Sequence, residues 1–358
     1  MVRYVVRTFF VILIAGAVGT GIGCGKAKSK FKPPDIKMIT SEYVLAAAAP
    51  RDSLVWMVGD HGIIYHSTDE GKTWAEQHSG VGTLLCDVVF LDDKNGWISG
   101  IKGVMLHTSD GGATWKRQDP GTQRHLLAVS FVDRQYGWAV GEYCTIVHTS
   151  DGGTTWHPQS RELDSIYNDV FFTDRDNGWV IGETGTILHT VNGGADWKPV
   201  QPDFFKRETL EEEYENPRPT LFGMYFSDRD HGWMCGLDST IIHTADGGTT
   251  WKVLNTGTDI LYNIAVKGDR GWAVGNQGVF FMSRDGGITW ELQQEKIKSK
   301  LLFANLAFSG PRKGWITGAS GTVVRTTDGG DSWTFYSGLS YETEWFKMPE
   351  GLEKRIIE

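Results

Sequence analysis

Five histidines recur at regular intervals and are the first residues in this chain that suggest chemistry. They are His66, His107, His148, His189 and His243, half of the ten histidines present. Histidine is the commonest metal ligand among protein side chains, so a column of imidazoles raises the hypothesis of a metal centre. Whether two of them can reach one ion depends on the elements that carry them.

A tandem repeat carries these histidines. It is marked by two tryptophans 18 residues apart, a pair that occurs seven times and includes 14 of the 15 tryptophans. Successive copies are offset by 41, 41, 41, 54, 39 and 43 residues. A period of about 40 to 45 residues is the length of one four-stranded propeller blade. The pairs are Trp56 and Trp74, Trp97 and Trp115, Trp138 and Trp156, Trp179 and Trp197, Trp233 and Trp251, Trp272 and Trp290, and Trp315 and Trp333.

The third copy shows four strand signals, which we name a to d. Residues 127–132, 138–141 and 145–149 are short β-prone runs, and a fourth strand begins at 154–157. One blade cannot bury both faces of its sheet, so the copies must stack around an axis. We predict an all-β fold, a seven-bladed β-propeller of four-stranded antiparallel blades over residues 44–340. Either residues 36–40 or the tail around Trp345 could close the ring.

The connections between strands b and c carry a Gly-x-x-Gly pattern, such as Gly182 and Gly185. Glycine readily adopts the positive φ that tight hairpin turns need. We expect that freedom to explain the pattern.

Propeller geometry argues against a metal ring. Strand c is third from the axis, so with strands about 4.8 Å apart its radius is roughly 16 Å, and equivalent residues on adjacent blades lie roughly 14 Å apart. Zn–N bonds are about 2 Å long, so no single ion reaches two of these histidines. In the other two repeats Met282 and Arg325 take the same position. We therefore interpret the column as packing between blades, and we expect no metal site and no cofactor.

The turn between strands c and d has the most specific pattern, Ser/Thr-x-Asp-x-Gly-x-Thr-Trp. Side-chain oxygens in such a turn accept hydrogen bonds from its own amides, and glycine takes the strained position. The pattern resembles the Asp-box of bacterial neuraminidase repeats. That resemblance implies a structural role rather than a catalytic one for Asp69, Asp110, Asp151, Asn192, Asp246, Asp285 and Asp328.

A second column lies in the turns between strands a and b, where every repeat has a basic residue, usually beside an aspartate. These residues are Arg51, Lys94, Arg134, Arg175, Arg229, Arg270 and Arg312. Because the a–b turns gather on one face of a propeller, the column could form a docking surface for acidic groups of a partner. The alternative is local Asp–Arg pairing within each turn, which contributes little when exposed.

The 54-residue offset marks an insertion after the fourth blade. It contains Phe204 and Phe205, then Glu211, Glu212 and Glu213 beside Tyr214. We expect a loop or short helix on the side of the connections from strand d to the next strand a. It is either a partner-recognition element or a solvated surface loop.

The N-terminus resembles an export signal. Arg3 and Arg7 precede an apolar run of about ten residues, and small residues lead to Cys24. This arrangement resembles a bacterial lipobox, so we expect residues 1–24 to be a lipoprotein signal peptide with Cys24 lipidated. Ordinary secretion is the alternative. Residues 25–43 would be a tether and 341–358 a C-terminal tail. We expect an extracytoplasmic protein, anchored by lipid to a bacterial membrane in the periplasm or at the outer membrane.

Cys86, Cys144 and Cys235 then remain in the exported chain, an odd number. We expect partly buried thiols, with a disulfide between Cys86 and Cys144 as the alternative.

Charge and motifs restrict the function classes. The 358 residues have a formal net charge of -9, which disfavours a nucleic-acid binder. No nucleophile elbow, P-loop or His-Glu-x-x-His motif occurs, so we predict no catalytic residues. A pair of glycosidase carboxylates needs no local motif and stays possible.

Taken together, the lipobox and repeats such as 178–182 and 185–190 resemble the photosystem II stability and assembly factor family. The resemblance covers nearly all of residues 44–338 and implies a seven-bladed, often lipid-anchored propeller that is a non-enzymatic scaffold. We therefore expect a monomer that binds a protein partner, in a membrane complex under assembly, and that reaches the membrane through its lipid. The second hypothesis is a glycan-binding protein or a glycoside hydrolase, because xyloglucanases share Asp-box blades.

Overall fold

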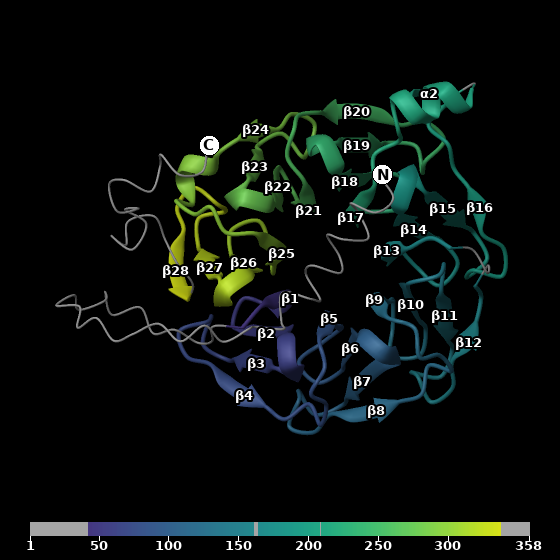
Figure 1. Cartoon of the computed structure of the whole chain (residues 1–358). Helices are drawn as coiled ribbons and strands as arrows, with labels where there is room; N and C mark the ends of the chain where they lie inside the picture. The colour runs from purple at the N-terminus through teal and green to yellow at the C-terminus, as the bar shows by residue number, and fades with distance from the viewer. Residues whose placement is uncertain (1–41, 161–163, 208, 338–358) are drawn as a thin grey trace, which may run out of the picture. The chain divides into compact units, whose positions relative to one another are not determined.

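The chain folds into a seven-bladed β-propeller, seen along its axis in Figure 1. The computed structural model describes residues 42–160, 164–207 and 209–337. Each blade is a four-stranded antiparallel sheet of consecutive strands. The predicted fold class is therefore confirmed.

The strands of the first four blades have the following bounds. Blade 1 contains β1 (Val44–Arg51), β2 (Leu54–Gly59), β3 (Ile64–Ser67) and β4 (Ala75–Gln77), and blade 2 contains β5 (Leu85–Phe90), β6 (Gly96–Gly100), β7 (Val104–Thr108) and β8 (Lys116–Gln118). Blade 3 contains β9 (Leu126–Phe131), β10 (Gly137–Gly141), β11 (Ile146–Thr149) and β12 (His157–Pro158), and blade 4 contains β13 (Tyr167–Phe172), β14 (Gly178–Gly182), β15 (Ile187–Thr190) and β16 (Lys198–Pro199).

Three further blades complete the ring. Blade 5 contains β17 (Leu221–Phe226), β18 (Gly232–Gly236), β19 (Ile241–Thr244) and β20 (Lys252–Asn255), and blade 6 contains β21 (Leu261–Lys267), β22 (Arg270–Gly275), β23 (Phe280–Ser283) and β24 (Glu291–Leu292). Blade 7 contains β25 (Phe303–Phe308), β26 (Gly314–Gly318), β27 (Val323–Thr326) and β28 (Thr334–Ser337). Helix α2 (Leu210–Glu215) and the 3-10 turn η4 (Asp203–Phe205) lie between blades 4 and 5. Among the described residues, no helix is long and apolar enough to span a bilayer.

The ring closes where blade 1 packs against blade 7. The first strands of the blades surround the axis, and β1 contacts both β5 and β25 (Figure 1). The Ala47 N–H donates to Asn305 Oδ1 at 3.2 Å, and the Gly321 N–H donates to the Glu42 carbonyl at 2.8 Å. All four strands of blade 1 are consecutive in the chain, and among the described residues no strand from elsewhere joins that sheet. The two proposed closing segments, 36–40 and the tail near Trp345, lie outside the described residues.

Stacked aromatic side chains form the interface between neighbouring blades. Trp97 lies between His107 of its own blade, with ring centroids 4.7 Å apart, and Phe131 of the next blade, at 3.8 Å. The same sandwich surrounds Trp56, Trp138 and Trp179. The histidines of the column therefore contribute to packing, as their spacing predicted. Burial lowers the pKa of all five imidazoles.

The Asp-boxes join one blade to the next as well as closing their own turns. In blade 3, Asp151 Oδ1 accepts from the Thr155 N–H at 2.9 Å, and Thr149 Oγ1 accepts from the Gly153 N–H at 2.8 Å. The Gly152 carbonyl of the same turn accepts from Trp97 Nε1 of blade 2 at 3.2 Å. These hydrogen bonds close the turn and join it to the neighbouring blade.

The fourth Asp-box has Asn192 at the aspartate position and Asp196 at the threonine position, and it keeps the hydrogen bonds of the turn. Asn192 Oδ1 accepts from the Asp196 N–H at 2.9 Å, and Asn192 Nδ2 donates to Asp196 Oδ2 at 3.1 Å. In the usual copy a carboxylate accepts from a threonine hydroxyl. Here the amide is the donor and the carboxylate has moved to the threonine position, so the turn keeps its hydrogen bonds.

The glycines of the b–c connections have two different roles, only one of which was expected. Gly185 has φ +64, the left-handed conformation that favours glycine. Gly182 is extended, with φ -170, but a Cβ there would lie 2.2 Å from the Ile166 carbonyl oxygen. At Gly182, glycine is needed because the backbone at Ile166 approaches closely. At Gly185, it is needed because φ is positive.

The cysteines of the propeller are thiols. Cys86, Cys144 and Cys235 form no disulfide in the structure, which excludes the alternative of a bridge between Cys86 and Cys144. Burial raises the pKa of Cys86 to about 12, with the nearby Asp87 charge adding to the shift. The cysteines are packed as small apolar side chains, as expected.

Candidate functional site

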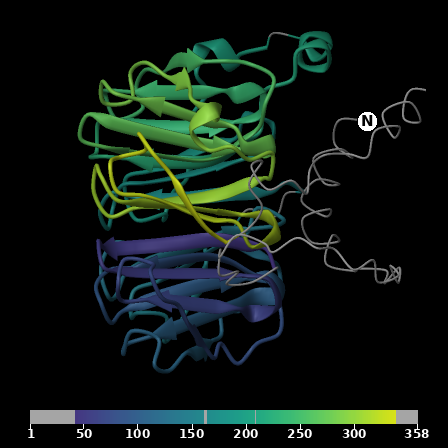
Figure 2. The ribbon, with the colours of Figure 1, turned by 90° about the vertical axis from the view of Figure 1, so that its left-hand side faces the viewer.

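The predicted basic column lies on one face of the propeller. Strand a ends and strand b begins there in every blade, so Arg51, Lys94, Arg134, Arg175, Arg229, Arg270 and Arg312 are brought to the same edge of the ring. In the edge-on view of Figure 2, β1 runs toward this edge, away from the edge that carries α2. The topology thus places the seven residues on one face, and we call them the basic ring.

The aspartates of these turns hold two partners at once. Asp133 Oδ1 accepts from the N–H groups of Gln135 and Tyr136, at 2.8 and 2.9 Å, which fixes the turn. Asp133 Oδ2 is paired with Arg175 of the next blade at 2.6 Å. Arg134 and Arg229 pair in the same way with Asp92 and Asp174 of the preceding blade, each at 2.8 Å. The pairing is therefore between blades and not within a turn, which neither hypothesis for this column foresaw.

The pKa values of the aspartates in these turns are set by groups next to them. Partial burial of Asp174 opposes its ionisation, but the Asn177 amide, the turn N–H groups and Arg229 together lower its pKa to about 2. The carboxylates are thus ionised at neutral pH, while the paired arginines stay accessible: the Arg134 side chain is 68% exposed. Exposed ion pairs contribute at most about 1 kcal/mol each, so an acidic group of a partner can compete for these guanidinium groups at small cost.

The other members of the basic ring differ. Arg51 pairs with Asp93 of the following blade at 2.7 Å. Beside Arg312, Lys313 was not predicted as a contact residue, but it bridges Asp52 and Glu70 across the seam between blades 7 and 1. Within the described ranges, Lys94 and Arg312 form no ion pair.

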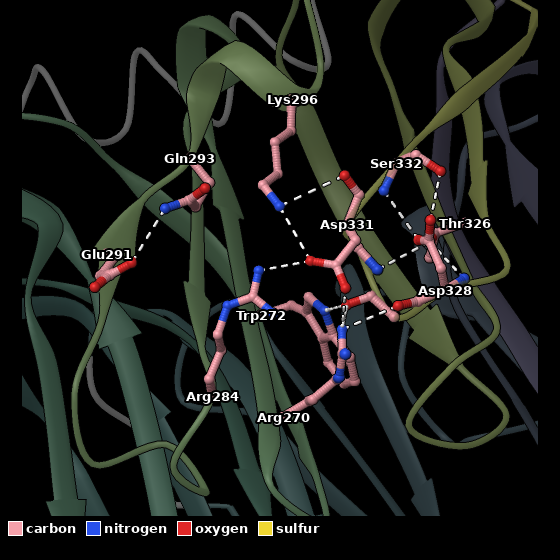
Figure 3. A network of polar contacts seen from close by, with 12 residues as sticks. Arg270, Trp272, Arg284, Glu291, Gln293, Lys296, Thr326, Asp328, Asp331 and Ser332 are labelled. Carbon is pink, nitrogen blue, oxygen red and sulfur yellow. Dashed lines mark hydrogen bonds and ion pairs between the residues drawn. The ribbon is translucent and has the colours of Figure 1, made fainter.

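Arg270 belongs to a denser cluster at the junction of blades 6 and 7, shown in Figure 3. Asp331 accepts from Arg270 at 3.1 Å, Arg284 at 2.5 Å and Lys296 at 3.2 Å. The Arg284 hydrogen bond is the largest influence that lowers the pKa of Asp331 well below its usual range. Glu291 and Asp328 lie in the same cluster, so its three cations are matched by three carboxylates.

The insertion after blade 4 has a buried base and an exposed tip. Phe205 is buried and Phe204 packs partly against the same apolar cluster, so these two candidates hold the insertion to the propeller. Glu213 pairs with Arg218 at 3.0 Å. Of the predicted contact residues, Glu211 and Glu212 are exposed on α2. Tyr214 between them and the helix end is 88% exposed and was not among the candidates.

Two partly buried carboxylates near the axis were missed by the sequence analysis. Asp169 in β13 accepts from the N–H groups of Val170 and, in the next blade, Met224, at 2.8 and 2.9 Å. Asp87 has the same two contacts in blades 2 and 3. Burial, reinforced by the charge of Asp87, raises the pKa of Asp169 to about 8. Their signal was a charged residue inside an otherwise apolar strand a.

Comparison with known proteins then decides the family. A sequence model of the photosynthesis system II assembly factor YCF48 family matches residues 19–106, 115–204, 202–301 and 254–343. The chain belongs to the YCF48 family. The resemblance inferred from the repeats is thereby confirmed.

Individual relatives of this YCF48-family chain show how far the likeness extends. The photosystem II assembly protein Ycf48 of Thermosynechococcus vestitus (strain NIES-2133 / IAM M-273 / BP-1) is 48% identical over 33 residues, which are 9% of this chain and a tenth of that protein. A solved structure described as YCF48 bound to D1 peptide superposes with a TM-score of 0.66 at 21% identity, covering 82% of this chain and 95% of that one.

An enzyme also shares the architecture. The GH74 xyloglucanase from Xanthomonas campestris superposes with a TM-score of 0.64 at 12% identity, covering 84% of this chain and 55% of that one. At these identities the structural likeness shows the fold alone.

Proposed function

We propose that this YCF48-family chain is a non-enzymatic, membrane-anchored scaffold that binds a protein partner while a membrane complex is assembled. Family membership supports this proposal most directly, since the family is named for photosystem II assembly. The solved YCF48 with a bound D1 peptide adds that a propeller of this kind can bind a segment of a protein. Protein binding requires a surface and no catalytic constellation.

The basic ring is the surface we propose for the partner. Arg134, Arg175 and Arg229 are exposed, and their ion pairs with aspartates join blades 2 to 5. The strand β1 starts at the opposite edge of the propeller. If Cys24 is lipidated and anchors the chain to a membrane outside the cytoplasm, as we propose, the chain enters the propeller at that opposite edge. The basic ring is then free to meet a partner.

Charge removal tests this surface. Arg134, Arg175 and Arg229 would be replaced together by Gln, and the matched control would replace Lys116, Arg117 and Lys198, exposed cations of the outer strands. Both variants lose the same charge and keep the core. We expect the ring variant to lose capture of its membrane partner from detergent-solubilised native membranes, while the control retains it.

Equal capture by the two variants would rule out the basic ring. A third variant, Glu211→Lys with Glu212→Lys, tests α2 as the alternative surface. Hydrolysis or binding across a polysaccharide panel tests the glycan hypothesis, and a positive result there would overturn the scaffold proposal.

A further inference from the structure

Three potential metal ligands converge beside the first strand of blade 1. His61 Nδ1 lies 3.3 Å from Glu42 Oε2 and 3.6 Å from Asp60 Oδ2. The three donor atoms all lie within 4.8 Å of one another. Glu42 comes from the segment before β1, whereas Asp60 and His61 belong to the turn η1 (Asp60–Gly62) after β2. The cluster therefore joins two separate segments of the chain.

These separations fit coordination of one ion. In a tetrahedral zinc site with bonds of about 2.0 to 2.1 Å, neighbouring donor atoms are about 3.4 Å apart. The two distances from the imidazole nitrogen lie on either side of that value. The third pair, Glu42 and Asp60, lies within 4.8 Å, so all three groups can reach one ion if these two carboxylates approach each other.

The repeats provide an internal comparison that shows the cluster is not a requirement of the fold. The residue at the position of His61 has positive φ in every blade, but it is Lys102, Tyr143, Thr184, Asp238, Gln277 or Ser320 in the other six. Blade 3 comes nearest, since Glu142 lies 3.5 Å from His125. That pair offers two donor groups where blade 1 offers three.

We propose that Glu42, Asp60 and His61 form a binding site for a divalent transition-metal ion of the zinc type. One imidazole nitrogen and two carboxylate oxygens suit Zn²⁺, and three protein ligands leave a coordination position for water or for a donor atom of a partner. The ligands come from two separate segments, the start of β1 and the turn η1, so the role we assign to the ion is to hold these segments together.

The backbone around the cluster indicates what the ion would stabilise. The Asp60 N–H donates to the Tyr43 carbonyl at 3.0 Å, and the Glu42 carbonyl accepts from the Gly321 N–H of blade 7 at 2.8 Å. An ion held by Glu42 and the η1 turn would therefore fasten the start of β1 at the seam where blades 1 and 7 meet. Metal binding to the folded state raises the apparent stability by mass action.

Zn²⁺ titration of the purified chain, with a chromophoric chelator as competitor, tests the proposal. We expect one equivalent to bind, and the His61→Asn variant to bind at least tenfold more weakly. Asparagine tolerates the left-handed backbone of position 61 (φ +54), so this variant should keep its fold. The control is His125→Asn, which removes the two-donor pair of blade 3 and should leave the affinity unchanged.

A second readout separates the site from adventitious binding. With Zn²⁺ in hundredfold excess over its dissociation constant, we expect the melting temperature of the wild type and of His125→Asn to rise by about 4 °C. The His61→Asn and Glu42→Gln variants should show no such rise. Binding of equal strength in wild type and His61→Asn, or equal loss in His125→Asn, would overturn the proposal.

Discussion

Replacing the partly buried carboxyl of Asp169 by an amide should change how stability depends on pH. The pKa of Asp169 is raised from 3.8 to about 8 in the folded state, chiefly by burial. Between these values the unfolded chain is ionised and the folded chain is protonated. The folded state then binds the extra proton, so the free energy of unfolding falls as pH rises, by about 1.4 kcal/mol per pH unit.

The magnitude follows from that slope. From pH 5 to pH 7, Asp169 alone should cost the folded protein about 2.7 kcal/mol. With an unfolding entropy of about 2.1 cal/mol/K per residue and roughly 300 folded residues, this corresponds to about 4 °C in melting temperature. Asp169→Asn removes the dependence and loses one N–H partner, a cost of about 1 kcal/mol that does not vary with pH.

The variant should fold, because the chain already uses asparagine at this register. Asn305 occupies the corresponding position in blade 7, where its Oδ1 accepts from Ala47 of the next blade. Melting curves at pH 5, 6 and 7 give the measurement. We expect the difference in melting temperature between variant and wild type to increase with pH in the variant's favour. If the melting temperatures of the two proteins differ by the same amount at all three pH values, the reasoning is refuted.

An Asp-box carboxylate provides the control of opposite sign. The Thr155 N–H and hydroxyl lower the pKa of Asp151 to about 2, so its contribution is present above pH 4 and is lost as pH falls through 2. Because the group is exposed, we expect Asp151→Asn to cost only about 1 kcal/mol. Between pH 5 and 7, the melting temperature of this variant should change with pH as that of the wild type does. A different pH dependence in that window would contradict the assignment.

Two further predictions concern an aromatic stack between blades and a close backbone approach within one blade. Trp138→Ala removes a side chain stacked between His148 and Phe172. In chemical denaturation it should lower the free energy of unfolding by about 3 to 5 kcal/mol. A loss below about 1 kcal/mol would show that the stack contributes little to stability. Gly141→Ala places a Cβ 1.8 Å from a backbone carbonyl oxygen and should prevent soluble expression or lower the melting temperature sharply, while Gly82→Ala, with nothing within 4 Å, should behave as wild type in the same assay.

The sequence was sufficient for the fold because the repeat contains its own evidence. The spacing of Trp97 and Trp115, repeated seven times, determined the blade number, and the radius of strand c showed that His107 and its equivalents could not share an ion. A structural role for the Asp-box can be predicted from sequence, because its oxygens and amides are close together in the chain.

The parts that were missed depend on contacts between distant segments. The partner of Arg175 is Asp133, 42 residues away in another turn, and local sequence pairs it with its own neighbour instead. The convergence of Glu42 with His61 has no recognisable ligand spacing. The burial of Phe205 likewise could not be separated from an exposed aromatic contact until the insertion was seen against the blades.

The most direct test of the central claim is crosslinking of the chain to its partner in native membranes. A photoreactive residue would be placed at Gln135, in an a–b turn beside the basic ring, and in a second protein at Glu211 on α2. We expect the probe at Gln135 to yield a stoichiometric crosslink to a subunit of a membrane complex, identified by mass spectrometry. No reproducible protein crosslink from either position, in membranes where the chain is abundant, would contradict the account of this protein as a partner-binding scaffold.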